Sequence, residues 1–141
     1  MKIRLDFVTN SSSTSYLISL KGKFTLENFT KAAGVDKTPW LGRMFSRLFK
    51  IISGHNKEIS DVVKMEREYY DEDETLDSYL ERAWPDREET VKALLAAGRK
   101  VYVGSFEDGG MGASELECLF CADSFFLEND EIFFDASEER Y

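Results

Sequence analysis

The sequence predicts an α+β fold, in which a mixed or antiparallel sheet packs against four to six helices. Two observations carry this prediction. Short or alternating apolar runs, typical of strands, occur near the N-terminus, near residues 100–106 and near the C-terminus. A block with helical spacing of apolar residues lies between the first and the second of these regions. Strands and helices are therefore segregated along the chain rather than alternating.

Two strands and a short helix are expected at the N-terminal end. Residues 2–8 alternate apolar and charged side chains, which predicts a half-buried strand, and the apolar residues 16–20 predict a second one. Together they form an N-terminal strand pair. A turn at 21–23 then leads into a short helix, which Thr25 caps and Gly34 stops.

Helices are expected through the middle of the chain. Thr38 and Pro39 combine an N-cap hydroxyl with a proline at the first helical position, and helical spacing continues to about Ser53. Asn56 is expected to cap the next helix. The acidic run 71–74 then interrupts the helical pattern.

Two more helices and three strands complete the prediction. An apolar stripe over 76–84 stops at Pro85, and Asp86 with Glu89 has the spacing of a capping box for a helix that ends at Gly98. The remaining segments are a strand at 100–106, a glycine-containing loop at 109–112, a helix from Ser114, and a hairpin of strands at 124–127 and 131–135.

The length and composition suit one domain, residues 1–141. Of the 141 residues, 43% are hydrophobic and 13% aromatic, enough for a core without a disulfide or a metal. No run approaches the ~18 apolar residues of a membrane span. Charged Lys2, Arg4 and Asp6 interrupt the apolar stretch that a signal peptide needs, so we expect a cytoplasmic protein.

The net charge of −9 is unevenly distributed. Residues 1–57 contain ten Lys or Arg against three Asp or Glu, whereas residues 58–141 contain eight against twenty-four. Non-specific binding of nucleic acid by the whole chain is disfavoured, because neutralising phosphates requires a basic surface. We expect the acidic half to face a basic helix inside the molecule.

A polar run between the first two predicted strands is the leading candidate for a functional site. Consecutive amides and hydroxyls in such a loop can bind phosphate or carboxylate, here with Lys2, Arg4 or Lys21 nearby. The run is also a candidate for covalent modification, or an ordinary turn whose side chains bond their own backbone. Its residues are Thr9, Asn10, Ser11, Ser12, Ser13, Thr14 and Ser15.

The opening residues MKIRLDFVTNSSSTSY resemble the start of a scattered set of short microbial and phage proteins for which no activity is known. Those proteins begin with a basic strand followed by F-V-[ST]-N-S-S-S-S-S-F. Thr14 stands here in place of a serine and Tyr16 in place of the phenylalanine, and the resemblance covers residues 1–18. It implies that the loop does more than connect two strands, and it supplies no catalytic residues.

The predicted helix from Thr38 carries Arg43, Arg47 and Lys50 on one side, and Trp40, Phe45 and Phe49 flank its apolar stripe. Such a face suits docking on an anionic membrane, a nucleic acid or an acidic partner. In the alternative interpretation, the helix belongs to the core and its basic face meets the acidic half or water.

Catalytic motifs are incomplete. The sequence lacks G-x-S-x-G, and His55 is the only histidine. Asp71 and Asp73 resemble the opening of haloacid-dehalogenase-type phosphatases, but the residues before them have a helical pattern and not that of a buried strand. The same stretch lacks the glycine and the final glutamate of a calcium loop.

Metal and cofactor sites are not predicted. Cys118 and Cys121 supply two ligands where zinc needs four, and buried thiols are the simpler interpretation. The glycines of 109–112 follow two acidic residues and precede no lysine, unlike a phosphate loop. We assign no catalytic residue.

The sequence thus predicts a non-catalytic binding or interaction module that uses loop 9–15 to hold an unknown protein or an anionic small molecule. One alternative is an enzyme or binder of a phosphate-bearing small molecule, using Asp71 and Asp73 or a serine with His55. Another is an acidic protein that docks a basic partner. Its many aromatic residues leave a homodimer open.

Overall fold

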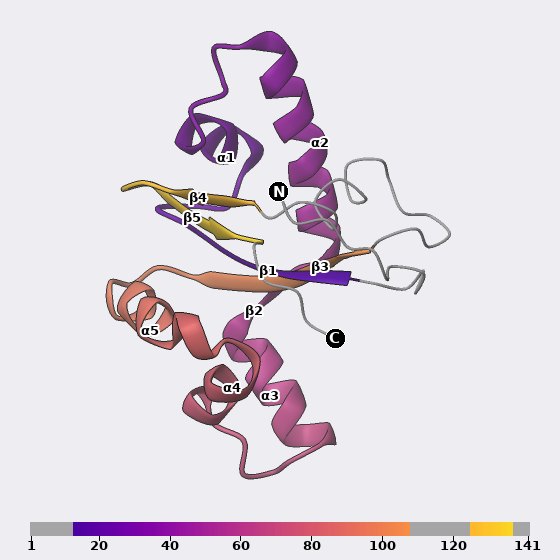
Figure 1. The fold of residues 1–141 in the computed structure, drawn as a ribbon, viewed down its shortest axis with the longest axis vertical. Coiled ribbons are helices and arrows are strands. Elements are labelled where there is room, and N and C mark those ends of the chain that lie inside the picture. Colours follow the sequence, from indigo (N-terminus) through magenta and orange to yellow (C-terminus); the bar gives the residue numbers. More distant parts are fainter. Residues whose placement is uncertain (1–12, 108–124, 137–141) are drawn as a thin grey trace.

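A five-stranded antiparallel sheet lies between two layers of helices (Figure 1). The computed structural model describes residues 13–107 and 125–136. The strands are β1 (Ser13–Leu20), β2 (Lys57–Glu58), β3 (Val101–Glu107), β4 (Phe126–Glu128) and β5 (Ile132–Asp135). The helices are α1 (Leu26–Ala32), α2 (Pro39–His55), α3 (Ile59–Tyr69), α4 (Leu76–Ala83) and α5 (Glu88–Ala96), with a 3-10 turn at Pro85–Arg87. The predicted α+β class is confirmed, and the sheet is the antiparallel alternative.

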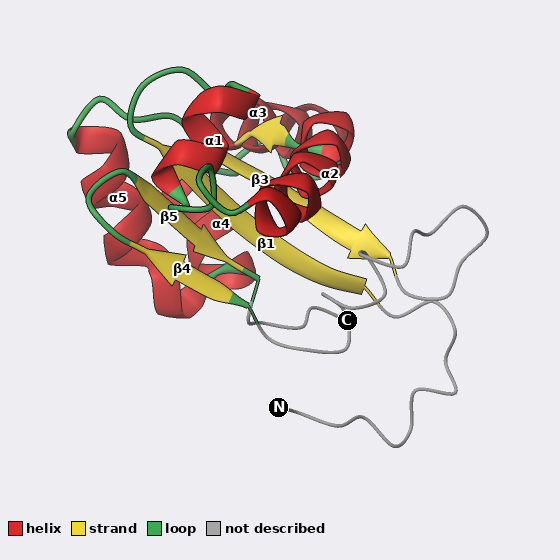
Figure 2. Cartoon of the chain, turned by 90° about the horizontal axis from the view of Figure 1, so that it is seen from above, coloured by secondary structure: helices red, strands yellow, loops and turns green. Residues whose placement is uncertain are grey.

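The strand order is β2-β3-β1-β5-β4, so β1 is the central strand (Figure 2). It pairs antiparallel with β3 on one side and with β5 on the other, and β4 closes the hairpin predicted at the C-terminal end. Helices α1 and α2 cover one face of the sheet and α3, α4 and α5 cover the other (Figure 1).

Successive residues of β1 enter two different cores. Tyr16, Ile18 and Leu20 pack with α1 and α2, whereas Leu17 packs with α3, α4 and α5. Side chains alternate between the two faces of a strand. The sequence of a strand that is covered on both faces is therefore an unbroken run of apolar residues. This explains why residues 16–20 show no polar alternation, although Ser19 is also buried and donates from its Oγ to the Lys100 carbonyl at 2.8 Å.

The core on the α1–α2 side is rich in aromatic rings. Phe29 is fully buried, and its ring centroid lies 5.8 Å from that of Phe45 and 6.4 Å from that of Phe134. On the opposite face the core contains Leu80 and Trp84, also buried. Each helical layer therefore depends on the same sheet for its apolar contacts.

A buried ion pair joins α5 to the sheet. The Asp135 side chain is fully buried in β5, and Arg87, at the turn before α5, pairs with it. The guanidinium also lies over the rings of Phe126 and Phe133, at 5.3 and 5.9 Å from their centroids. Charge pairing and cation–π contacts together fix the start of α5 against β4 and β5.

Several helix boundaries agree with the sequence. Thr25 caps α1 by accepting the Asn28 N–H at 3.2 Å, and Pro39 is the first residue of α2. Trp84 is the C-cap of α4, directly before Pro85. Within the described residues, no helix is both long and apolar enough to cross a membrane.

Two predicted caps are wrong. Asn56 is the C-cap of α2 and does not start the next helix, because Lys57 and Glu58 first pair with β3 as strand β2. Asp86 does not cap α5, because Pro85 places it inside the 3-10 turn and the helix begins only at Glu88.

The predicted loop 9–15 also ends too late. Residues 13–15 belong to β1, where Ser13 pairs with Glu107 and Ser15 with Ser105. The partner strand supplies hydrogen bonds that a local reading of these polar residues does not reveal. The first predicted strand at 2–8, loop residues 9–12, the glycine loop, the helix from Ser114 and both cysteines lie outside the described residues.

Candidate functional site

Three turns meet at the end of the sheet where β1 finishes and β3 starts. They are the turn after β1, the turn between α5 and β3, and the turn of the β4–β5 hairpin. The Lys21 backbone N–H donates to the Glu131 carbonyl at 2.8 Å. Arg99 Nη2 donates to the carbonyls of Ser19 at 2.9 Å and Glu131 at 3.3 Å. These bonds hold the three turns together, although the residues they join are at least 32 positions apart in the chain.

The first two turns line a cleft of about 530 Å³. Lys21 and Lys23 come from the turn after β1, and Arg99 and Lys100 from the turn before β3. The lysines are exposed and Arg99 is half-buried. We call the cleft lined by these four cations the basic cleft.

One wall of the basic cleft is aromatic. Phe24 and Tyr102, both half-buried, line it, and their ring centroids are 5.2 Å apart. The ring of Phe24 also stacks on Phe49 of α2 at 5.0 Å, which anchors this wall to the core. The cleft thus offers positive charge and an apolar surface side by side.

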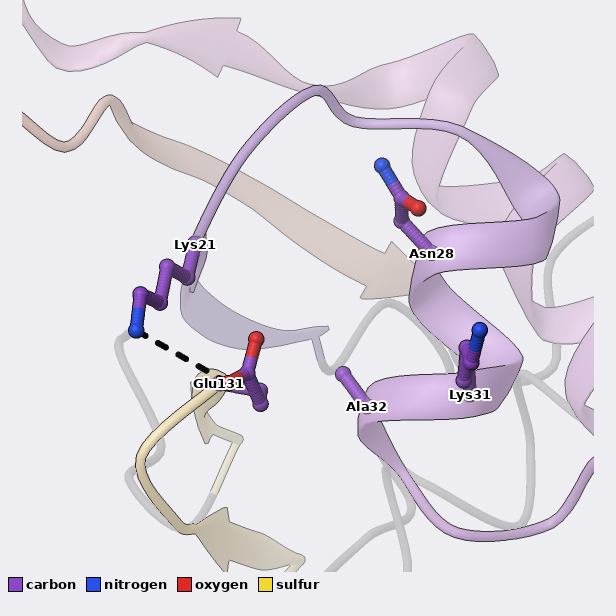
Figure 3. A pocket seen from close by; sticks show the side chains of 5 residues that line it. All are labelled: Lys21, Asn28, Lys31, Ala32 and Glu131. Atoms are coloured by element: carbon purple, nitrogen blue, oxygen red, sulfur yellow. Dashed lines mark ion pairs between the residues drawn. The ribbon is translucent and has the colours of Figure 1, made fainter.

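A second cavity of about 370 Å³ adjoins the basic cleft and shares Lys21 with it (Figure 3). Asn28, Lys31 and Ala32 of α1 form one side, and Glu131 of the hairpin turn lies opposite. The Lys21 Nζ and a Glu131 carboxylate oxygen are 3.9 Å apart, with both side chains more than half exposed. Such an exposed pair neutralises little charge.

Positive charge predominates in the two cavities. The described residues that line them include five Lys or Arg and one carboxylate, that of Glu131. Partial burial lowers the pKa of Arg99, and the Glu131 carboxylate opposes this change. Arg99 Nε is buried and has no acceptor among the described residues. A desolvated and incompletely neutralised guanidinium favours a nearby anion.

Glycines shape both turns of the basic cleft. Gly22 and Gly98 have φ of +93° and +81°, in the left-handed region that other residues rarely adopt. The sequence around each is basic on at least one side, Lys21-Gly22-Lys23 in one turn and Gly98-Arg99-Lys100 in the other. These two tripeptides are the signal by which sequence reasoning could have found Lys23, Arg99 and Lys100, which it missed.

The predicted anion site is only partly assembled. Lys21 lies in the basic cleft, but Ser15 is six residues earlier on the same extended strand, about 20 Å away at ~3.3 Å per residue. Lys21 therefore cannot share one small ligand with Ser13, Thr14 and Ser15, and that part of the prediction is wrong. Lys2, Arg4, Thr9, Asn10, Ser11 and Ser12 lie outside the described residues.

Ser15 lines a different cavity, on the α3–α5 face. It has about 280 Å³ and includes Lys57 and Ser105, with the largely buried rings of Tyr79 and Trp84. Ser15 and Ser105 are register partners on β1 and β3. One hydroxyl of the predicted run thus lies beside a second hydroxyl and a lysine, far from Lys21.

Arg43, Arg47 and Lys50 are exposed on α2, and none of them forms an ion pair within the described part of the chain. Their helix does contribute to the core, as expected. Among the described residues, the sheet separates α2 from the acidic helices α3, α4 and α5, so the expected pairing with that part of the acidic half does not form (Figure 1). The acidic residues of 108–124 lie outside the described residues. Both faces of the sheet are apolar, so each requires its own layer of helices.

The residues considered for catalysis do not assemble with the basic cleft. Asp71 and Asp73 are exposed in the connection between α3 and α4, and neither lines any of the three cavities described above. His55 is the last residue of α2. Within 13–107 and 125–136, no three His, Cys, Asp or Glu side chains are placed to hold a metal ion.

Comparisons of the chain with protein-family models, with curated proteins and with solved structures gave no match.

Proposed function

We propose that this chain is a binding module whose ligand is a phosphate-bearing small molecule held in the basic cleft. The observation that carries the proposal is the convergence of Lys21, Lys23, Arg99 and Lys100 from two turns, with Glu131 as the one carboxylate among the described residues that line the two cavities. Lysine and arginine donate charge-assisted hydrogen bonds to phosphate oxygens.

The aromatic wall supports an organic ligand over a bare anion. Phe24 and Tyr102 offer an apolar surface next to the cations. Small-molecule sites commonly combine such a surface with a few placed polar groups. A molecule with a phosphate group and an apolar or ring-containing body fits this combination.

The proposal retains the binding function that the sequence predicts. It locates the binding site at the opposite end of β1 from the run of hydroxyl residues. A role for loop 9–15, a cytoplasmic location and the absence of catalysis stay predictions. Lys21 is the residue common to both versions of the site.

The test is a titration followed by backbone amide chemical shifts, with inorganic phosphate, pyrophosphate and a nucleoside monophosphate as probes. We expect shifts at residues 20–24, 97–102 and 131, and tighter binding of the nucleotide than of inorganic phosphate. Lys23→Gln with Lys100→Gln removes two cations that have no described ion-pair partner, and we expect affinity to fall about tenfold or more.

The matched control is Lys57→Gln with Lys64→Gln, which changes the net charge equally on the opposite face of the sheet. Its affinity should stay close to that of the unaltered chain. Equal losses in both double variants, or no shifts in the cleft at millimolar concentrations of all three probes, would overturn the proposal.

A further inference from the structure

The outer side of α2 presents an aromatic ring and three cations together. At 100° per residue, Trp40, Arg43, Arg47 and Lys50 lie within an arc of about 80°. Trp40 is 60% exposed and the other three are exposed. Buried Phe45 and its neighbours occupy the opposite side of the helix. We call these four residues the basic stripe.

Among the residues that the structure describes, the basic stripe has no charge partner in its own layer. Helix α2 contains no Asp or Glu, and residues 21–56 as a whole contain seven Lys or Arg against two Asp or Glu. An exposed tryptophan within such a stripe is the kind of residue that anchors protein interfaces. The stripe thus has the composition of an unoccupied docking surface.

The complementary surface comprises the last residues of α3 and the start of its connection to α4, on the other face of the sheet. Its residues 68–73, which we call the acidic tip, are exposed and comprise four carboxylates and two tyrosines. Tyr69 and Tyr70 are 70% and 79% exposed. Its layer, residues 58–98, contains thirteen Asp or Glu against five Lys or Arg.

Hydrogen bonds fix the shape of the acidic tip. The Asp71 N–H donates to the Glu66 carbonyl at 2.9 Å, and the Asp73 N–H donates to Asp71 Oδ1 at 3.0 Å. Arg67 Nε donates to the Glu74 carbonyl at 3.0 Å, just behind the tip. The carboxylates and tyrosine rings are therefore presented on an ordered backbone, which limits the entropy lost on docking.

The two surfaces lie at opposite ends of the molecule. The start of α2 and the connection between α3 and α4 mark the two ends of the longest axis (Figure 1). One molecule cannot bring its own stripe and tip together across the sheet. A second copy, placed end to end with the first, can bring its acidic tip to the basic stripe.

We propose that the basic stripe of one molecule docks on the acidic tip of a second copy. Three cations then meet four carboxylates, and the arginines can stack on Tyr69 and Tyr70. At a net charge of −9, copies repel one another in most orientations, and this end-to-end contact places unlike charges together. The contact leaves one stripe and one tip free, so it repeats head to tail.

Sedimentation velocity tests the proposal. At about 0.05 M salt, the weight-average sedimentation coefficient should rise with concentration, and at about 0.5 M salt it should fall to that of the monomer, because salt screens the contact. Arg43→Glu with Arg47→Glu should weaken association about tenfold or more, and so should Asp71→Lys with Asp73→Lys.

A mixture of the two double variants distinguishes this contact from others. The first keeps an intact tip and the second an intact stripe, so each alone should be monomeric. Mixed, they should associate again, because the intact stripe of the second variant meets the intact tip of the first, and the two altered surfaces carry exchanged charges of opposite sign. The control, Lys57→Glu with Lys64→Glu, matches the charge change of the first variant and should still assemble.

Three results would overturn the proposal. One is a monomer at every concentration in low salt, and another is assembly that both double variants retain. The third is a monomer that instead binds vesicles containing phosphatidylserine, or duplex DNA, through Arg43 and Arg47, which would assign the stripe to that surface. Variants of the basic cleft should leave assembly unchanged, so the two proposals can fail independently.

Discussion

At the scale of single residues, Glu74 shows how one carboxylate in an acidic run differs from its neighbours. Asp71, Glu72 and Asp73 are exposed, but Glu74 is buried. Ser78 Oγ donates to its carboxylate, and Arg82 Nη2 lies 2.8 Å from Oε2. These two hydrogen bonds, the Ser78 bond first, hold the pKa of Glu74 below its ordinary value.

Glu74→Gln should therefore destabilise the protein in a pH-dependent manner. Because the folded-state pKa is lowered, the ionised carboxylate contributes stability above its ordinary value of 4.5 and loses it as the pH falls through the folded-state pKa. Urea unfolding should give a lower midpoint for the variant at pH 7, with the difference shrinking toward pH 3.

Glu72→Gln removes an exposed carboxylate two residues earlier and serves as the control. Its urea midpoint should match that of the unaltered chain at both pH values. A Glu74→Gln difference that stays constant from pH 7 to pH 3 would mean that the ion pair with Arg82 contributes nothing.

At the scale of elements, Gly98 and Gly54 both have space for a side chain, but substitution of each by alanine should change the stability in opposite directions. Gly98 follows α5 with φ of +81°, and Gly54 lies in the last turn of α2. Apart from the local backbone, a β-carbon at either position would meet no heavy atom of the described residues within 4 Å. Only the backbone conformation distinguishes them.

Gly98→Ala should lower the free energy of unfolding by about 1 kcal/mol, because alanine is strained in the left-handed region. Gly54→Ala should raise it by about 0.5–1 kcal/mol, because alanine favours the helix and restricts the unfolded chain. Chemical denaturation of both variants measures the two signs, and a shift of the same sign in both would contradict this account.

The sequence predicts most elements because their signals are local. Proline at the first position of α2 and a hydroxyl cap at Thr25 each depend on nearby residues alone. Strand β2 was missed because its two charged residues gain their conformation from pairing with β3. The Thr75 capping box of α4 was missed because Ser78 takes the place where Glu or Gln is usual.

At the scale of the whole molecule, one sheet supports two cores. The side chains of β1 enter both, so loss of packing on one face removes the support of the other. The two helical layers should therefore unfold together rather than as separate units.

Leu80→Ala tests this coupling. Leu80 is fully buried on the α3–α5 side, and its truncation should cost about 3 kcal/mol. Amide hydrogen exchange should accelerate in α2 as much as in α3, although α2 lies on the other face. Faster exchange confined to α3, α4 and α5 would show independent layers, and Leu26→Ala, at a more exposed position, should change little.

The candidate site was harder to predict than the fold, because its residues come together only through the pairing of strands that are distant in the chain. Lys21 was identified from its own neighbourhood, but Arg99 and Lys100 reach it only because β1 and β3 pair antiparallel. Charge counts along the chain gave the right asymmetry, but they do not reveal that a sheet lies between α2 and the acidic helical layer of α3, α4 and α5 (Figure 1).

The central position of β1 also sets an order of events during synthesis. Its two pairing partners, β3 and β5, begin at Val101 and Ile132, more than eighty residues later in the chain. While the ribosome makes the helices in between, the apolar strand has no neighbour on either side. The nascent chain therefore carries an apolar strand without its sheet partners until the last strand emerges, and such a segment favours aggregation during that interval.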